Sequence, residues 1–290
     1  MKVKLDCIPC FQRQALEASR FVTKDIILQE KILRRVIKEL ENMDWTGTPP
    51  DMAHVVHQIV KEECKVNDPY KEIKTQYNDI ALSIYPEMKE IVNNSADPLL
   101  TAARLAIAGN IIDFGASSQF DLNETISKVL EKEFAINDFD KLLETLGRSN
   151  ILLYLADNTG EIVFDKLLLE TILNKYKINK ILFGVKGAPI INDAMIEDAE
   201  YVGINKLPGV EFIKIGIGLP NTGVERNSKE FHDILTNSDI VISKGQGNYE
   251  ALSKYGDIFF LLMAKCPVIA DDLNVKIGDF ILKETKKVQN

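Results

Sequence analysis

Apolar residues in the first part of the chain recur every three or four positions, which is the period of an amphipathic helix. Residues 26–40 show this spacing and predict a helix. Two prolines then interrupt the pattern, and Asp51 can cap a new helix that begins near Met52. A third helix is predicted over residues 97–110, where leucines and alanines favour helix. We therefore expect residues 1–135 to form a mainly helical region.

From about residue 150 the pattern changes to short apolar runs, which are typical of strands buried on both faces. The runs lie at 151–156, 180–185, 211–215, 239–243 and 258–262. Two shorter apolar runs, which predict edge strands, lie at 268–270 and 280–282. Segments with helical spacing separate the runs, at 161–176, 193–202, 228–237 and 248–255. Strands that alternate with helices imply right-handed crossovers and a mainly parallel sheet, so residues 136–290 are predicted to form an α/β domain.

Composition and charge narrow the class of protein. The 290 residues are 46% hydrophobic and 27% charged, as expected of a globular protein with a substantial core. The net charge of -8 and a pI of about 5.1 argue against nucleic acid or an anionic membrane as a partner. A small anionic ligand is still compatible with this charge, because one bound metal or one lysine can dominate the local field.

The chain shows no targeting signal in its sequence. No apolar run approaches the roughly 18 residues of a membrane helix, and the first residues lack the apolar stretch of a signal peptide. The four cysteines, Cys7, Cys10, Cys64 and Cys266, are too few for a disulfide scaffold in a chain of this length. We expect a cytoplasmic protein with reduced thiols.

Polar residues follow the predicted strands at the sheet edge where α/β proteins bind ligands. Asp157 and Asn158 come after the first strand, Asp193 after the second, and Lys244 and Gly245 after the fourth. Carboxylate and amide oxygens suit a hard divalent cation such as Mg²⁺ or Mn²⁺. A lysine, and a glycine that lets backbone N–H groups approach an anion, suit a phosphate ester next to that cation.

A purely structural explanation of the same residues stays open at this point. An Asp-Asn pair after a strand often forms a turn and caps the next helix. Glu161 can interact with the helix dipole or orient a water, and Asn248 can cap a helix or point into a cleft. Two nucleotide-binding motifs are absent: Gly216 and Gly218 lack the third glycine of a dinucleotide fingerprint, and no Walker sequence occurs.

Four segments carry most of the candidate polar residues, namely Ala108–Gly115, Ala156–Asp165, Ile190–Met195 and Lys244–Glu250. Together, in this order and over nearly the whole chain, they resemble one known family. It is the family of metal-dependent damage-control phosphatases, formerly catalogued as domain of unknown function 89. The start Asp6-Cys-Ile-Pro-Cys10 resembles the prokaryotic, CxxC-containing branch of that family.

The resemblance implies a fold and a reaction. The helical N-terminal region would pack on a Rossmann-like, mainly parallel, three-layer αβα domain. A divalent metal, with Mn²⁺, Mg²⁺, Co²⁺ and Ni²⁺ as candidates, would be held by Asp157, Asn158 and Asp193. The activity would be hydrolysis of small phosphorylated metabolites, either sugar phosphates or damaged phospho-metabolites. The eukaryotic members with sugar-phosphate activity carry a different residue at Gly247 and lack the CxxC start, so the resemblance does not carry the substrate over.

The resemblance also implies roles for residues around the metal. Lys244 would contact the substrate phosphate. Asn110 and Asp113 would line the same cleft from one face of a helix. With these two, the candidate substrate-binding residues are Asn110, Asp113, Glu161, Gly245 and Asn248, and the candidate catalytic residues are Asp157, Asn158, Asp193 and Lys244.

Two other functions stay open. The chain could be a non-catalytic nucleotide or sugar-phosphate binding protein, which would bind such ligands without turnover. It could also be a thiol-based metal or redox protein that uses Cys7 and Cys10, since a helix N-terminus lowers the pKa of a thiol. His54 and His57 share one helix face but have no evident third ligand, and we expect a surface pair. The oligomeric state is not predicted.

Overall fold

The computed structural model describes residues 1–109, 119–216, 223–226 and 228–286. Its N-terminal part is helical, as predicted. The helices are α1 (Cys7–Val22), α2 (Ile26–Asn42), α3 (Pro49–Cys64), α4 (Lys71–Asn94), α5 (Pro98–Ala108) and α6 (Gln119–Glu131). Across these described ranges, no helix is both long enough and apolar enough to pass through a membrane.

Strands and helices alternate in the rest of the chain, which confirms the predicted α/β class. The strands are β1 (Phe134–Asn137), β2 (Ile151–Leu155), β3 (Lys180–Lys186), β4 (Val210–Ile215), β5 (Ile240–Lys244), β6 (Ile258–Met263) and β7 (Phe280–Thr285). The α-helices are α7 (Phe139–Arg148), α8 (Glu161–Lys175), α9 (Ile196–Tyr201), α10 (Lys229–Asn237), α11 (Gln246–Leu252) and α12 (Pro267–Leu273).

The strands form one mainly parallel sheet in the order β1-β7-β6-β5-β2-β3-β4. β6 and β7 pair antiparallel, and the other neighbours pair parallel. β2 lies between β5 and β3. The chain adds β3 and β4 on one side of β2 and then β5 on the other side, so the order of the strands reverses at β2. Such a reversal creates a crevice at the carboxyl ends of the central strands, where ligands bind in open α/β sheets.

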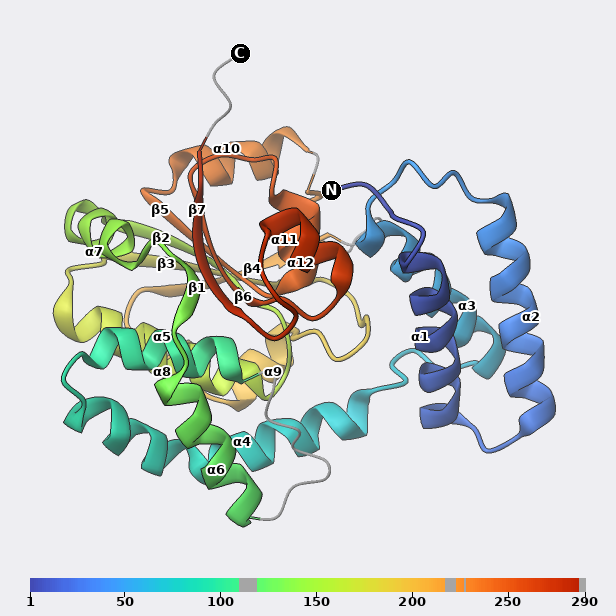
Figure 1. Cartoon of the computed structure of the whole chain (residues 1–290), viewed down its shortest axis with the longest axis horizontal. Coiled ribbons are helices and arrows are strands. Elements are labelled where there is room, and N and C mark those ends of the chain that lie inside the picture. The colour runs from blue at the N-terminus through green and yellow to red at the C-terminus, as the bar shows by residue number, and fades with distance from the viewer. Residues whose placement is uncertain (110–118, 217–222, 227, 287–290) are drawn as a thin grey trace.

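Helices cover both faces of the sheet and complete the three-layer architecture (Figure 1). Consecutive residues of β2 point to opposite faces. Leu152 and Tyr154 pack with α4, α5 and α8, whereas Leu153 and Leu155 pack with α10, α11 and α12. Because both faces are covered, β2 is apolar along its whole length, and this explains the unbroken run in the sequence.

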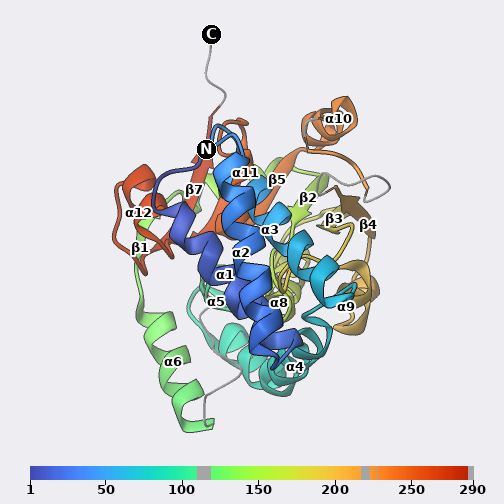
Figure 2. The same cartoon turned by 90° about the vertical axis from the view of Figure 1, so that its right-hand side faces the viewer.

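Helices α1, α2 and α3 form a separate unit, which we call the helical lobe, with a core of its own. Figure 1 shows the lobe beside the sheet, and Figure 2 shows it from the front. α3 contacts α11, and the Lys61 ammonium donates to the Pro189 carbonyl. Helices α4 and α5 instead share the core of the sheet. The sequence division at residue 135 stays a prediction.

Three local expectations from the sequence were wrong. The run 280–282, expected as an edge strand, belongs to β7, which lies between β1 and β6 inside the sheet. α3 begins at Pro49 rather than near Met52, because proline suits the first turn of a helix. Thr48 is the N-cap, and the Asp51 carboxylate accepts a hydrogen bond from the Thr48 N–H. The run 268–270, expected as an edge strand, lies inside α12, which begins at Pro267. Three apolar residues alone do not distinguish a strand from a buried helix.

Candidate active site

The loops that follow β2 and β3 are joined to each other at the edge of the sheet. Asn158 and Asp193 form an isolated antiparallel bridge, and the Ala194 N–H donates to the Asp157 carbonyl at 2.8 Å. The three residues that the sequence proposed as metal ligands, Asp157, Asn158 and Asp193, are therefore brought together. All three line one cleft of about 580 Å³ between the sheet edge and the helical lobe.

The side chains of these residues form an acidic, poorly solvated group. Asp157 and Asn158 are each 8% exposed. Burial raises the pKa of Asp157 to about 8, and the carboxylates of Glu161 and Asp193 add to this rise. Burial also raises the pKa of Asp193. The Asn158 amide nitrogen donates to Asp157 at 2.8 Å and to Glu161 at 3.4 Å. Such a surplus of negative charge is what a bound cation would neutralise, since metal binding displaces protons from its ligands.

Gly245 gives Asp157 the space that it occupies. The glycine has φ +80°, and a Cβ atom there would lie 1.9 Å from Oδ2 of Asp157. Its N–H donates to the Leu261 carbonyl at 3.0 Å. Only glycine satisfies both the backbone conformation and the close approach. In this structure Gly245 therefore acts on the site by leaving room for a carboxylate.

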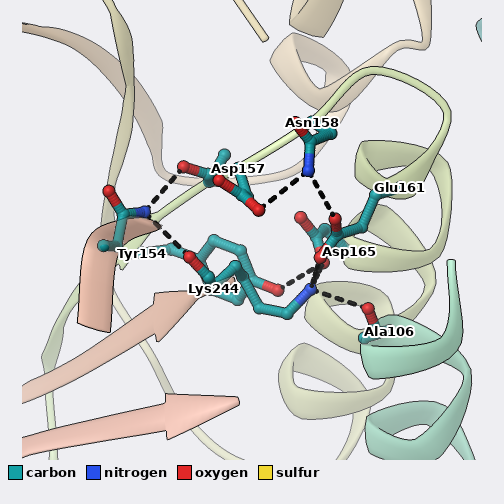
Figure 3. A network of polar contacts seen from close by, with 9 residues as sticks. Ala106, Tyr154, Asp157, Asn158, Glu161, Asp165 and Lys244 are labelled. Atoms are coloured by element: carbon teal, nitrogen blue, oxygen red, sulfur yellow. Dashed lines mark hydrogen bonds and ion pairs between the residues drawn. The ribbon is translucent and has the colours of Figure 1, made fainter. Parts of the chain in front are cut away.

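Lys244 lies beneath the cleft and is fully buried (Figure 3). Its ammonium donates to Glu161 at 2.5 Å, to Asp165 at 2.8 Å and to the Ala106 carbonyl at 2.7 Å. These bonds use all three N–H groups of the lysine. The Tyr154 hydroxyl donates to the same Asp165 oxygen at 2.7 Å. The predicted contact of Lys244 with a phosphate stays a prediction, because its partners here are protein groups.

In this buried network one ammonium faces two carboxylates. Burial by itself would lower the pKa of Lys244, but Asp165 and Glu161 outweigh burial and hold the pKa above its usual value. Burial raises the pKa of Asp165 to about 6, against the lowering effect of Lys244. A chain of contacts therefore runs from Lys244 through Glu161 to the amide of Asn158.

Asn248 links the strand ends from the other side. Its amide nitrogen donates to the Ala156 carbonyl at 3.0 Å and to the Lys244 carbonyl at 2.9 Å. Its amide oxygen accepts from the ammonium of Lys186 at 3.2 Å, and Lys186 also lies 3.4 Å from Asp193. Sequence reasoning gave Lys186 no role, although its place at the end of a predicted strand was a usable signal.

Asn78 is a second residue that sequence reasoning missed. It lies on α4, is 1% exposed, and accepts a hydrogen bond from the Gly160 N–H at 2.7 Å. This bond fixes the loop that carries Asp157 and Asn158. Because Asn78 precedes the loop by about eighty residues, no local pattern could have pointed to it. Asn110 and Asp113, the other predicted cleft residues, lie outside the described residues.

The cysteines and histidines do not form a metal centre in the part of the chain that the structure describes. There, no group of three His, Cys, Asp or Glu side chains could hold a metal ion. Cys7 and Cys10 line the cleft as free thiols, and burial raises the pKa of Cys7, so this thiol is not activated. The surface pair expected of His54 and His57 is wrong, because His57 is 2% exposed and burial lowers its pKa to about 3.

The fold and the site define an α/β protein with an acidic cleft at the carboxyl ends of its central strands. The chain belongs to the family of the damage-control phosphatase ARMT1-like domain, whose model matches residues 3–281. The resemblance to this family found in the sequence motifs is thereby confirmed, and membership of its CxxC-containing branch stays a prediction.

The relatives match this chain over nearly their whole length. A damage-control phosphatase of Archaeoglobus fulgidus is 33% identical, over 98% of this chain and 99% of that one. An uncharacterised protein of Methanocaldococcus jannaschii is 36% identical, over 97% and 95%. A crystal structure of a DUF89 family protein from Pyrococcus horikoshii is 32% identical, covers 99% of this chain and 100% of that one, and superposes with a TM-score of 0.87.

Replacing Lys244 tests whether the buried network carries stability. Lys244→Met leaves Glu161 and Asp165 buried without their cation, and we expect the free energy of unfolding to fall by about 3–5 kcal/mol. Urea unfolding at pH 7 measures the loss, with the exposed Lys229→Met as the control. Adding Asp165→Asn to Lys244→Met should recover part of the loss. A decrease of less than about 1 kcal/mol, the value of an exposed pair, would contradict this account.

Proposed function

We propose that this protein is a metal-dependent phosphatase that hydrolyses small phosphorylated metabolites, either sugar phosphates or damaged phospho-metabolites. The observation that carries the proposal is the convergence of Asp157, Asn158 and Asp193 in one cleft whose rim also carries cations. Two relatives that match over nearly the whole chain bear the name damage-control phosphatase. The cleft volume of about 580 Å³ falls in the range of small-molecule sites.

The donor set fits a hard divalent cation. Two carboxylates and one amide offer oxygen ligands, which Mg²⁺ and Mn²⁺ prefer and which Co²⁺ and Ni²⁺ accept. Asp157, Asn158 and Asp193 would hold the ion. When bound, a divalent metal supplies Lewis acidity toward a phosphoryl oxygen and lowers the pKa of water. The raised pKa of Asp157 fits this assignment, because burial and the neighbouring carboxylates of Glu161 and Asp193 disfavour its charged form, which a bound cation would stabilise.

The protein's own residues would position the substrate and balance its charge. Lys186, held between Asp193 and Asn248, brings a positive charge to the cleft beside the metal residues. Lys265 lines the cleft on another side and lowers the pKa of Asp157. Fixed cations of this kind stabilise the charge that develops on phosphoryl oxygens.

Lys244 acts in this proposal as a positioning residue. Its three N–H groups are taken up by Glu161, Asp165 and the Ala106 carbonyl, so it orients Asn158 through Glu161. The cytoplasmic location expected from the sequence stays part of the proposal, and the free cysteines are compatible with it.

Removing one carboxylate tests the reaction. The protein is stripped with a chelator and assayed for phosphate release from an aryl phosphate and a panel of sugar phosphates with Mg²⁺, Mn²⁺, Co²⁺ or Ni²⁺. We expect metal-dependent release, and a fall of about a thousandfold or more in kcat/KM for Asp157→Asn, because the metal loses a charged ligand. Asp271→Asn, an exposed change on α12, is the control.

Two results of this assay would overturn the proposal. A folded wild-type protein that releases no phosphate with any metal would favour the non-catalytic binding protein. Full activity in Asp157→Asn would remove the metal site from the reaction.

A substitution at Gly245 provides a second test, which measures metal affinity separately from catalysis. In Gly245→Ala the new Cβ would meet the Asp157 carboxylate, which must move, and we expect Mn²⁺ affinity to fall about tenfold or more. Gly247→Ala is a matched control, because its Cβ meets nothing within 4 Å. Isothermal titration calorimetry measures both affinities. Equal affinities in the two variants would show that Asp157 does not need this position to bind the ion.

A further inference from the structure

The cleft contains more cationic side chains than are needed to balance the carboxylates of Asp157 and Asp193. Its cationic lining residues are Arg13, Lys186, Arg226 and Lys265. Lys186 is paired with Asp193 and bonded to Asn248. Within the described ranges, the side chains of the other three form no ion pair and no hydrogen bond. Unpartnered cations that converge on one cleft, in a chain of net charge -8, point to an anionic ligand that uses them.

These three cations lie on different walls of the cleft. Lys265 follows β6 and Arg226 follows β4, so both come from the carboxyl-end edge of the sheet, and both line the cleft together with Asp157 and Asp193. Arg13 comes instead from α1 of the helical lobe, on the opposite wall.

Arg226 also interacts electrostatically with a residue of the helical lobe. It lowers the pKa of His54, a residue of α3 that lines the cleft and is half-buried. Arg13 of α1 and Arg226 after β4 thus line the same cleft as His54, and burial lowers the pKa of His54, so the two arginines carry the positive charge there. The remaining carboxylates of the cleft do not neutralise Arg13: neither Asp6 nor Glu250 forms an ion pair with it, and burial raises the pKa of Glu250 to about 7.

One phosphate on the metal does not account for this arrangement. Lys186 and Lys265 suffice for the oxygens of a phosphoryl group beside Asp157 and Asp193, which leaves the side chains of Arg13 and Arg226 without an ion pair among the described residues. The cleft, at about 580 Å³, has room for a substrate that reaches both walls. A guanidinium is a planar fork that binds a carboxylate or a phosphate with two parallel hydrogen bonds.

We propose that the substrate carries a second anionic group, separate from the phosphate that is hydrolysed, and that Arg13 of the helical lobe binds this group with Arg226 facing it. The site would thus select phosphomonoesters with two anionic ends, such as phosphorylated sugar acids or bisphosphates. This inference rests on the proposed phosphatase function, and it adds a substrate class and a specificity-determining residue.

Binding of matched, non-hydrolysable probes tests the inference. The probes are phosphonate analogues of glucose 6-phosphate, 6-phosphogluconate and glucose 1,6-bisphosphate, titrated into the Mn²⁺-loaded protein by calorimetry. We expect at least one doubly anionic probe to bind about tenfold or more tightly than the glucose 6-phosphate analogue. Arg13→Gln should reduce this ratio to about twofold or less, and Arg13→Lys should restore part of it.

Arg20→Gln is the matched control, because Arg20 lies on the same helix and outside the cleft lining. It should keep the wild-type ratio. A wild-type ratio below about twofold for both doubly anionic probes would overturn the inference, and so would an unchanged ratio in Arg13→Gln.

Phosphate release from the parent sugar phosphates, measured in parallel, separates this inference from the proposed function. Release without a binding preference would remove only the second anion site. A binding preference that depends on Arg13, without release from any parent compound, would remove the phosphatase function and retain the anion site.

Discussion

The buried ammonium of Lys244 is the interaction on which the geometry of the site depends. Glu161 and Asp165, at the start of α8, are almost completely buried, and burying carboxylates without a cation costs free energy. Lys244 reaches both and also the end of α5 through the Ala106 carbonyl. Strand β5 and two helices thus meet at one nitrogen. Because Glu161 also contacts Asn158, a lysine beneath the cleft orients a candidate metal ligand.

A second constraint is the close approach of β5 to the loop after β2. Gly245 permits this approach, and Asn248 maintains it through bonds to the carbonyls of Ala156 and Lys244. On the other side, Asn78 holds the Gly160 N–H. The loop that carries Asp157 and Asn158 is thereby fixed from β5, α11 and α4, and such preorganisation suits the proposed binding of an ion.

Local patterns predicted the fold and the acidic centre because both follow from short-range rules. Apolar runs fix the strands, and the residues after them must gather at one sheet edge, which brought Asp157 and Asp193 together. What local patterns missed or left open depends on partners distant in sequence. A lysine after a strand suggests a phosphate ligand, and only the three acceptors around Lys244 show it enclosed. Asn78 and Arg13 lie on helices, and the spacing of apolar residues in a helix does not show how that helix approaches the cleft.

The residues that line the cleft belong to two hydrophobic cores, one under the sheet and one in the helical lobe. This separates the residues of the proposed reaction from the residue proposed to select the substrate. The residues around Asp157 depend on the sheet and on α8, whereas Arg13 and His54 belong to a lobe with its own core. A substitution of Arg13 or His54 therefore need not disturb the buried network of Lys244, Glu161 and Asp165. The net charge of -8 opposes anionic ligands at long range, but salt screens that field beyond about 10 Å. Inside the cleft, the nearby cations, and a metal where one is bound, would dominate the field that the proposed ligand meets.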